Sequence, residues 1–259
     1  MRHLLLAAAA AITFVSVEQE IGIGREANAQ VRKEMPELTD TQVTSYVRSL
    51  TRRLAQVAPG PKYPYSVSVV NYRDINAFAL PGGPVWIHRG VLQAAGNESQ
   101  VAGVLAHEIA HIAQRHAADQ LTKGVLANLS LGALGALLGN SGGAGAAQMA
   151  AGFIANGVFL KFSRDDEREA DRVGLQILTR AGWDGRGMVE LFELLRREST
   201  RDPIAVEKFF ASHPAPADRI DGLRAAVARG KGGRRDTPEF QAVKARLQKM
   251  RAAPRMPER

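Results

Sequence analysis

Residues 99–113 read SQVAGVLAHEIAHIA and contain the pattern His107-Glu108-Ile109-Ala110-His111. Asn97 precedes this stretch and is a typical N-terminal cap, so we expect a helix to begin there. Apolar residues occupy almost every face of that helix, which predicts that it is buried. Residues four apart lie one turn above each other on one face, so the imidazoles of His107 and His111 converge on one point.

Glu108 has a different place on the predicted helix. It is rotated by about 100° from His107, too far to bind the same ion. It can still reach a water in an open coordination position, which is the geometry of a general base. A buried carboxylate and two buried imidazoles need partners, and a metal ion supplies them. The alternative is that all three are satisfied on the surface of an ordinary helix.

A catalytic zinc ion takes three protein ligands, so a third must come from elsewhere. His116 lies about 140° around the helix from His111 and is interpreted as a surface or supporting residue. A downstream acidic run is the better source. Glu167 and Asp171 are four apart and share a helical face, whereas Glu169 points away. We predict Glu167 as the third ligand and Asp171 as an acceptor for an imidazole N–H, the alternative being a solvated, charged helix start.

The rest of the chain predicts helices around a small sheet. The fold class is therefore α+β, mostly helical, with three or four strands. Strands are expected at 66–72, 77–80 and 85–88, and helices within 18–57 and at 97–118, 164–180, 185–197, about 219–223 and 240–250. Segment 121–160 is rich in Ala, Gly and Leu and is interpreted as a lid, an interfacial surface or buried core.

Composition narrows the class of protein. Of 259 residues, 45% are hydrophobic and 23% are charged, which is ordinary for a globular chain. There is no cysteine, so disulfides, thiolate zinc sites, cysteine nucleophiles and lipoprotein anchors are excluded. The net charge of +8 is concentrated after Arg224 and favours a solvated basic tail over a polyanion-binding surface. No nucleic-acid module is recognisable, and no nucleic-acid partner is expected.

The N-terminus resembles a secretory signal. Met1-Arg2-His3 is followed by an apolar run over residues 4–15, which is too short to span a bilayer. No clean small-residue cleavage site follows it. We expect export to a bacterial periplasm, with an uncleaved, membrane-associated N-terminus or a mis-set start codon as the alternatives.

Four ordered motifs together resemble the zinc metallopeptidase family of the HtpX/BepA-like and CAAX prenyl endopeptidases. They are His107 to His111, residues 163–174, residues 76–83, and Ser212-His213-Pro214 with Arg219. The resemblance implies a zincin fold of the gluzincin type and one Zn²⁺ per chain, with Glu167 as the third ligand. It also implies that His213 approaches the metal and blocks or gates the site, with Arg219 supporting the ligands. The alternative for His213 is a plain loop histidine that precedes the start of a helix. The implied domains are a signal or anchor at 1–17, the metallopeptidase domain at 18–228 and a basic tail at 229–259.

The implied activity is metalloendopeptidase cleavage of unfolded or misassembled envelope proteins, in the manner of the periplasmic BepA-like branch. Glu108 would take a proton from the attacking water and pass it to the leaving amine, with His213 helping at the oxyanion. The strand at 77–80 would pair with an extended substrate. Unlike in the BepA-like members, no tandem repeats follow the domain here. The alternatives are a chaperone-like assembly factor in the envelope, which segment 121–160 suggests through contact with proteins or the membrane surface, and a purely structural zinc.

Overall fold

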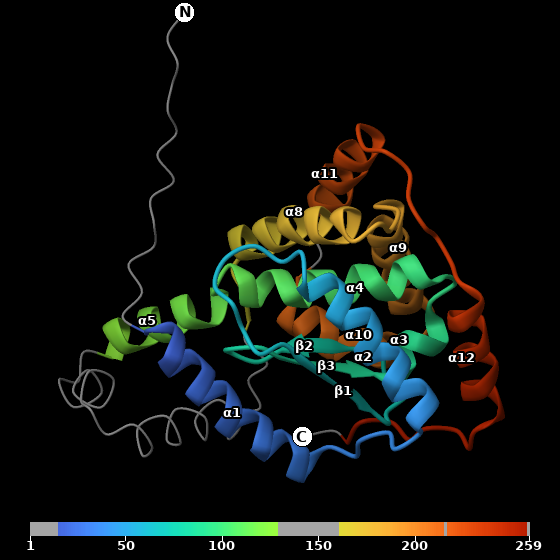
Figure 1. Cartoon of the computed structure of the whole chain (residues 1–259), viewed down its shortest axis with the longest axis horizontal. Coiled ribbons are helices and arrows are strands. Elements are labelled where there is room, and N and C mark those ends of the chain that lie inside the picture. The colour runs from blue at the N-terminus through green and yellow to red at the C-terminus, as the bar shows by residue number, and fades with distance from the viewer. Residues whose placement is uncertain (1–14, 129–160, 215–216, 258–259) are drawn as a thin grey trace, which may run out of the picture.

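A computed structural model describes residues 15–128, 161–214 and 217–257. In chain order its elements are α1 (Val17–Glu34), α2 (Thr41–Ala55), β1 (Ser66–Val70), β2 (Ala77–Ala79), β3 (Pro84–His88), α3 (Arg89–Ala94), α4 (Glu98–Ala113), α5 (His116–Asn128), α8 (Arg164–Arg180), α9 (Arg186–Arg201), α10 (Pro203–Ser212), α11 (Ala217–Ala228) and α12 (Pro238–Lys249) (Figure 1). The prediction of a mostly helical α+β fold with a small sheet is confirmed.

The sheet has three strands in the order β1-β3-β2. β1 pairs with β3 in parallel, with Val67 opposite Val85, and β2 pairs with β3 antiparallel, with Phe78 opposite Trp86. The turn between β2 and β3 needs left-handed backbone at Gly82, whose φ of +70° is costly for other residue types. This arrangement leaves β2 at an edge of the described sheet, beside α4.

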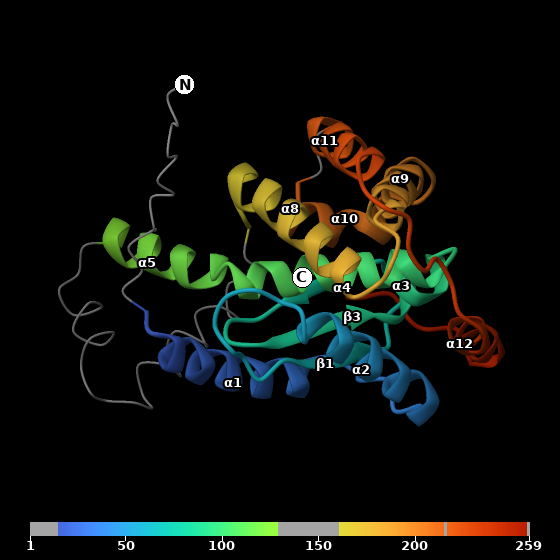
Figure 2. The ribbon, with the colours of Figure 1, turned by 45° about the horizontal axis from the view of Figure 1, so that its top comes forward.

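Helix α4 is the centre of the molecule. It begins as predicted, because the Asn97 side chain accepts a hydrogen bond from the Gln100 backbone N–H, and every residue from Glu98 to Ala113 is buried. It lies between the sheet on one side and α8 and α9 on the other (Figure 2). Apolar residues of the sheet, α8 and α9 pack against α4 in one core. The polar side chains of α4 are therefore shielded from bulk water.

The prediction of one continuous helix over residues 97–118 is wrong at its C-terminal end. α4 stops at Ala113, and Arg115 adopts a left-handed φ of 62° before α5 begins at His116. The Arg115 side chain stabilises this turn, since its Nε donates to Glu20 Oε2 at 3.0 Å and its Nη2 to Val15 O at 2.5 Å. The helix is therefore interrupted directly after the two histidines of α4.

The C-terminal segment, interpreted above as a basic tail, contains the helix expected at 240–250, and this helix is packed. Phe240, Val243 and Leu247 of α12 are buried in the main core. The spacing of these residues places them on one face, and Arg246 and Lys249 are exposed, whereas half-buried Lys244 donates to Ala95 O. Buried Arg89 fixes the following chain, because its Nη2 donates to Leu247 O at 2.8 Å and its Nη1 to Arg251 O at 2.9 Å.

None of the helices within the described ranges is long and apolar enough to cross a membrane. Most of segment 121–160 lies outside those ranges, as does the apolar run at 4–15 apart from its last residue. The interpretations of these two stretches as lid and as signal therefore stay predictions.

Candidate metal centre

Four buried side chains converge above the centre of α4. His107, His111, Glu167 and His213 each offer one nitrogen or oxygen, and these atoms all lie within 4.8 Å of one another. The Nε2 atoms of His107 and His111 are 3.1 Å apart. Glu167 Oε2 lies 3.5 Å from His107 Nε2, and its Oε1 lies 3.4 Å from His111 Nε2. The three ligands predicted from the sequence therefore meet at one point.

The start of α8 explains why Glu167 faces the histidines. Ser163 and Asp166 form a capping box: Ser163 Oγ accepts from the Asp166 N–H at 3.1 Å, and Asp166 Oδ2 accepts from the Ser163 N–H at 2.9 Å. The box places Glu167 in the first helical turn, with its side chain toward α4. Glu169 is 43% exposed and pairs with Arg172 at 3.0 Å, so it faces away from the cluster, as the helical phase predicts.

Glycine lets α8 approach α4 closely at this point. A Cβ on Gly174 would lie only 3.2 Å from the backbone of Ala106 and His107. Gly174 follows Glu167 by seven residues, two turns along the same face. The spacing of the two helices, and with it the distance from Glu167 to the imidazoles, is therefore set by a direct backbone contact.

A second layer of charges supports the four donors. Asp171 Oδ1 lies 3.2 Å from His107 Nδ1. Arg219 is buried and holds both carboxylates, with its Nε 2.7 Å from Asp171 Oδ2 and its Nη1 2.6 Å from Glu167 Oε2. Burial acts to raise the pKa of Asp171, but hydrogen bonds from Arg219 and His107 outweigh it, and the pKa is lowered. Asp171 is therefore an ionised acceptor behind His107.

Glu108 lies beside the cluster without joining it. It is fully buried, and neither of its oxygens has a hydrogen-bonding side chain among the described residues. The Nε2 atom of His213 lies 3.6 Å from Glu108 Oε1. Burial raises the pKa of Glu108, partly offset by His213 and His107. Such a carboxylate is suited to accept a proton from a water held next to it.

The donor set fits a divalent metal ion. Three buried carboxylates, those of Glu108, Glu167 and Asp171, face one buried guanidinium in the described part of the site, that of Arg219. Burial opposes protonation of His107, but hydrogen bonds to Asp171 and Glu167 outweigh it and raise its pKa to about 10. A divalent cation would take the place of that proton. Imidazole and carboxylate ligands without thiolate are typical of catalytic zinc.

His213 joins the cluster from α10. It is the residue after the last turn of that helix, and its Nδ1 lies 3.0 Å from Glu167 Oε1. The sequence left open whether this histidine is near the metal or in a plain loop. The structure places it between Glu167 and Glu108, buried, where it can act on both.

Of the two interpretations of His116, a surface residue or a supporting one, the structure excludes the first. The estimate of 140° assumed one continuous helix, and the turn at Arg115 invalidates it. His116 is 3% exposed, and its Nδ1 lies 2.9 Å from His111 Nδ1, on the side of that ring opposite the cluster. No glycine marks the left-handed turn, so the sequence offers no signal for it.

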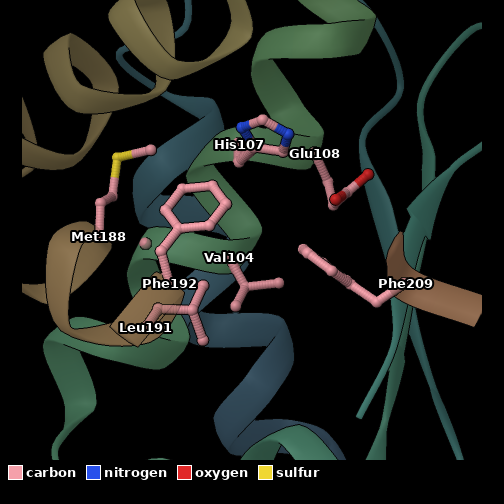
Figure 3. A pocket seen from close by; sticks show the side chains of 8 residues that line it. Val104, His107, Glu108, Met188, Leu191, Phe192 and Phe209 are labelled. Carbon is pink, nitrogen blue, oxygen red and sulfur yellow. The ribbon is translucent and has the colours of Figure 1, made fainter. Parts of the chain in front are cut away.

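Aromatic and apolar side chains shield the site. Phe162 stacks on the His111 ring with centroids 3.9 Å apart. A small pocket of about 10 Å³ opens beside His107 and Glu108 and is lined by Gly103, Val104, Met188, Leu191, Phe192 and Phe209. Phe192 from α9 and Phe209 from α10 approach it from opposite sides (Figure 3). Neither Phe162 nor Phe209 was predicted, because both arrive from elements distant in the sequence.

Comparison with known proteins agrees with this geometry. The chain is 35% identical over 220 residues to the beta-barrel assembly-enhancing protease of Escherichia coli K12, covering 81% of this chain and 44% of that protein. It is 30% identical over 196 residues to metalloprotease YcaL of the same organism, covering 73% of this chain and 75% of YcaL. It is 32% identical over 214 residues to the mitochondrial metalloendopeptidase OMA1 of Schizosaccharomyces pombe, covering 80% and 60% of the two chains.

The chain thus spans less than half the length of the first of these relatives. The model of peptidase family M48 matches residues 41–227, which include both histidines of α4, Glu167 and His213. The resemblance noted in the sequence is confirmed, and the chain belongs to peptidase family M48.

Proposed function

We propose that this protein is a zinc-dependent endopeptidase that binds one Zn²⁺ through His107, His111 and Glu167. The observation that carries the proposal is the buried carboxylate of Glu108, which has no hydrogen-bonding side chain among the described residues, beside a cluster of four metal-binding groups. A structural zinc site has no use for such a neighbour, because a buried carboxylate without hydrogen-bonding side chains costs stability. Family membership supports the same reaction.

Each residue has a separate task in the proposed reaction. A zinc ion at this site supplies positive charge that acidifies water and stabilises an oxyanion. Glu108 takes the proton of the attacking water and delivers it to the leaving amine. Asp171 holds the N–H of His107 and so fixes the tautomer that leaves Nε2 free for the ion. Arg219 keeps Asp171 and Glu167 ionised and in place.

His213 has two proposed roles that its position supports. With its Nδ1 on Glu167 and its Nε2 near Glu108, it stands between the proposed acidic ligand and the proposed base. In that position it blocks the site. If α10 shifts outward, the same imidazole can donate a hydrogen bond to the carbonyl oxygen of a bound peptide.

The edge strand offers a place for the substrate backbone. β2 is at an edge of the described sheet and packs beside α4. The backbone at Ala79 lies near enough to Glu108 to lower its pKa. An extended peptide that added to this edge would run past Glu108 and the cluster. We therefore propose unfolded or extended polypeptide segments as substrates.

The proposed setting is the bacterial envelope. One relative is named a beta-barrel assembly-enhancing protease, and the signal-like N-terminus supports export to the periplasm. We propose unfolded or misassembled envelope proteins, including outer-membrane proteins, as substrates, with membrane-surface contact through segment 121–160 as an additional feature. The alternative is a chaperone-like assembly factor built on the same domain.

Replacement of Glu108 by Gln tests the reaction. The amide keeps the shape of the side chain and cannot accept the proton, so casein cleavage should fall by about 10²-fold or more while zinc content is unchanged. Chelator should abolish the wild-type cleavage. Cleavage by E108Q at the wild-type rate would contradict the general-base role. If the wild type cleaves nothing and E108Q still suppresses the aggregation of an unfolded protein, the chaperone alternative is favoured.

A further inference from the structure

We propose that His116 is a positioning residue for the metal centre: it accepts a hydrogen bond from Nδ1 of His111 and so fixes the tautomer and ring orientation of that ligand. The inference rests on the proposed zinc site and gives a definite task to a residue for which the sequence left a surface position and a supporting one open.

The two nitrogens of His111 face different neighbours. Nε2 faces the cluster, 3.1 Å from His107 Nε2 and 3.4 Å from Glu167 Oε1. Nδ1 faces the other way and lies 2.9 Å from His116 Nδ1. A neutral imidazole carries one proton, so a ring that binds a metal through Nε2 has its proton on Nδ1. His111 must then donate, and His116 must accept.

The same logic fixes the tautomer of His116. If its Nδ1 accepts, its own proton is on Nε2. That atom points toward α8, where Glu169 Oε2 lies at 3.6 Å. This distance is longer than a direct hydrogen bond and suits a bridging water between the Nε2 proton of a neutral His116 and the carboxylate. The half-exposed carboxylate therefore favours the tautomer that serves His111, without holding it tightly.

The two histidine ligands thus have unlike supports. His107 is backed by Asp171, an ionised carboxylate that Arg219 holds. His111 is backed by a second imidazole. Neutral acceptors form weaker hydrogen bonds than carboxylates do. His111 is therefore the ligand whose orientation depends more on the rigidity of its neighbour than on charge.

That rigidity comes from the turn between α4 and α5. Arg115 holds the turn through Glu20, and Glu20 Oε2 also accepts from Tyr63 OH at 2.8 Å. Phe162 stacks on the His111 ring with centroids 3.9 Å apart and also lies 5.9 Å from the His116 ring. His116, only 3% exposed, is thereby held with its Nδ1 within hydrogen-bond distance of His111 Nδ1.

Two substitutions separate hydrogen bonding from packing. In His116→Asn the amide oxygen takes nearly the place of Nδ1 and can still accept, whereas in His116→Leu the volume is filled and no acceptor remains. Zinc affinity is measured by competition with a chromophoric chelator. We expect His116→Leu to bind zinc about 10- to 100-fold more weakly and His116→Asn to recover most of that loss. Equal affinity in wild type and His116→Leu, or equal losses in both variants, would overturn the proposal.

A measurement on the unaltered protein covers the case in which a variant does not fold. Histidine ring ¹⁵N spectra of the zinc-loaded protein report which nitrogen of each ring is protonated. We expect protonated Nδ1 on His111 and protonated Nε2 on His116. A proton on Nδ1 of His116 would overturn the proposal while leaving the zinc site intact. A wild-type protein that binds no zinc would instead contradict the proposed function, and this inference with it.

Discussion

The contact between α4 and α8 at Gly174 yields a quantitative prediction. In Gly174→Ala, the new Cβ would lie 3.2 Å from Ala106 O and from the His107 backbone. Such contacts are tighter than nearly all real Cβ contacts, so the helices must separate by a few tenths of an ångström. The neighbours are backbone atoms of a buried helix and cannot rotate away. Since Glu167 and the two imidazoles lie on opposite sides of this contact, the separation widens the cluster.

Two effects decide the size of the change. Overpacking of a tight contact costs about 1–3 kcal/mol, and alanine in place of a helical glycine returns about 1 kcal/mol. The free energy of unfolding of the metal-free protein should therefore fall by about 0–2 kcal/mol. Metal sites tolerate ligand displacements of about 0.2 Å, so zinc affinity should fall by about tenfold or more. Gly174→Ala should therefore weaken zinc binding clearly even if the metal-free protein loses little stability.

Urea denaturation and chelator competition measure the two quantities. Gly22→Ala is the matched control, because Gly22 lies inside helix α1 and a Cβ there would meet nothing within 4 Å. The control should gain up to about 1 kcal/mol and leave zinc affinity unchanged. If Gly174→Ala behaved like the control in both assays, the spacing of α4 and α8 would not set the ligand geometry.

Three further predictions concern charged groups. Glu167→Ala should lower zinc content to near zero and Glu169→Ala should leave it unchanged in metal analysis of the purified proteins; the reverse pattern would show that the acidic ligand is misassigned. Arg219→Met leaves the carboxylates of Asp171 and Glu167 buried without a cation, so urea denaturation should show a loss of about 3–5 kcal/mol, and an unchanged midpoint would contradict the pairing. Arg89→Leu removes the donors that hold the chain after α12, so hydrogen exchange should quicken there by at least about tenfold; unchanged protection would mean that other contacts hold it.

Local signals explain how much of the fold was predictable. Asn97 and Ser163 mark the starts of α4 and α8, because each caps its helix with its own side chain. The glycines between β2 and β3 mark the hairpin. The fold class followed from these elements. The strand order β1-β3-β2 did not, because it depends on pairing between segments far apart in the chain.

The candidate site was predictable where helical phase decides. The phase brings His107 together with His111 and separates Glu167 from Glu169, and the structure places these side chains accordingly. Their roles as ligands stay predictions. His116 was misplaced because phase holds only within an unbroken helix, and the turn that breaks α4 has no glycine or proline to announce it.

Long-range packing supplied what the sequence could not. Phe162 and Phe209 reach the site from outside α4, and no local pattern distinguishes them from other buried aromatic residues. Likewise, the sequence predicted the helix at 240–250, but its basic residues concealed that Phe240 and Leu247 are buried in the main core.

The central claim is that side chains from two helices hold one zinc ion beside Glu108. Anomalous diffraction at the zinc absorption edge, from crystals of the purified protein, tests it most directly. We predict one peak per chain within bonding distance of His107 Nε2, His111 Nε2 and a carboxylate oxygen of Glu167. A peak at Glu169 or elsewhere on the chain, or no peak from protein supplied with zinc, would contradict the account.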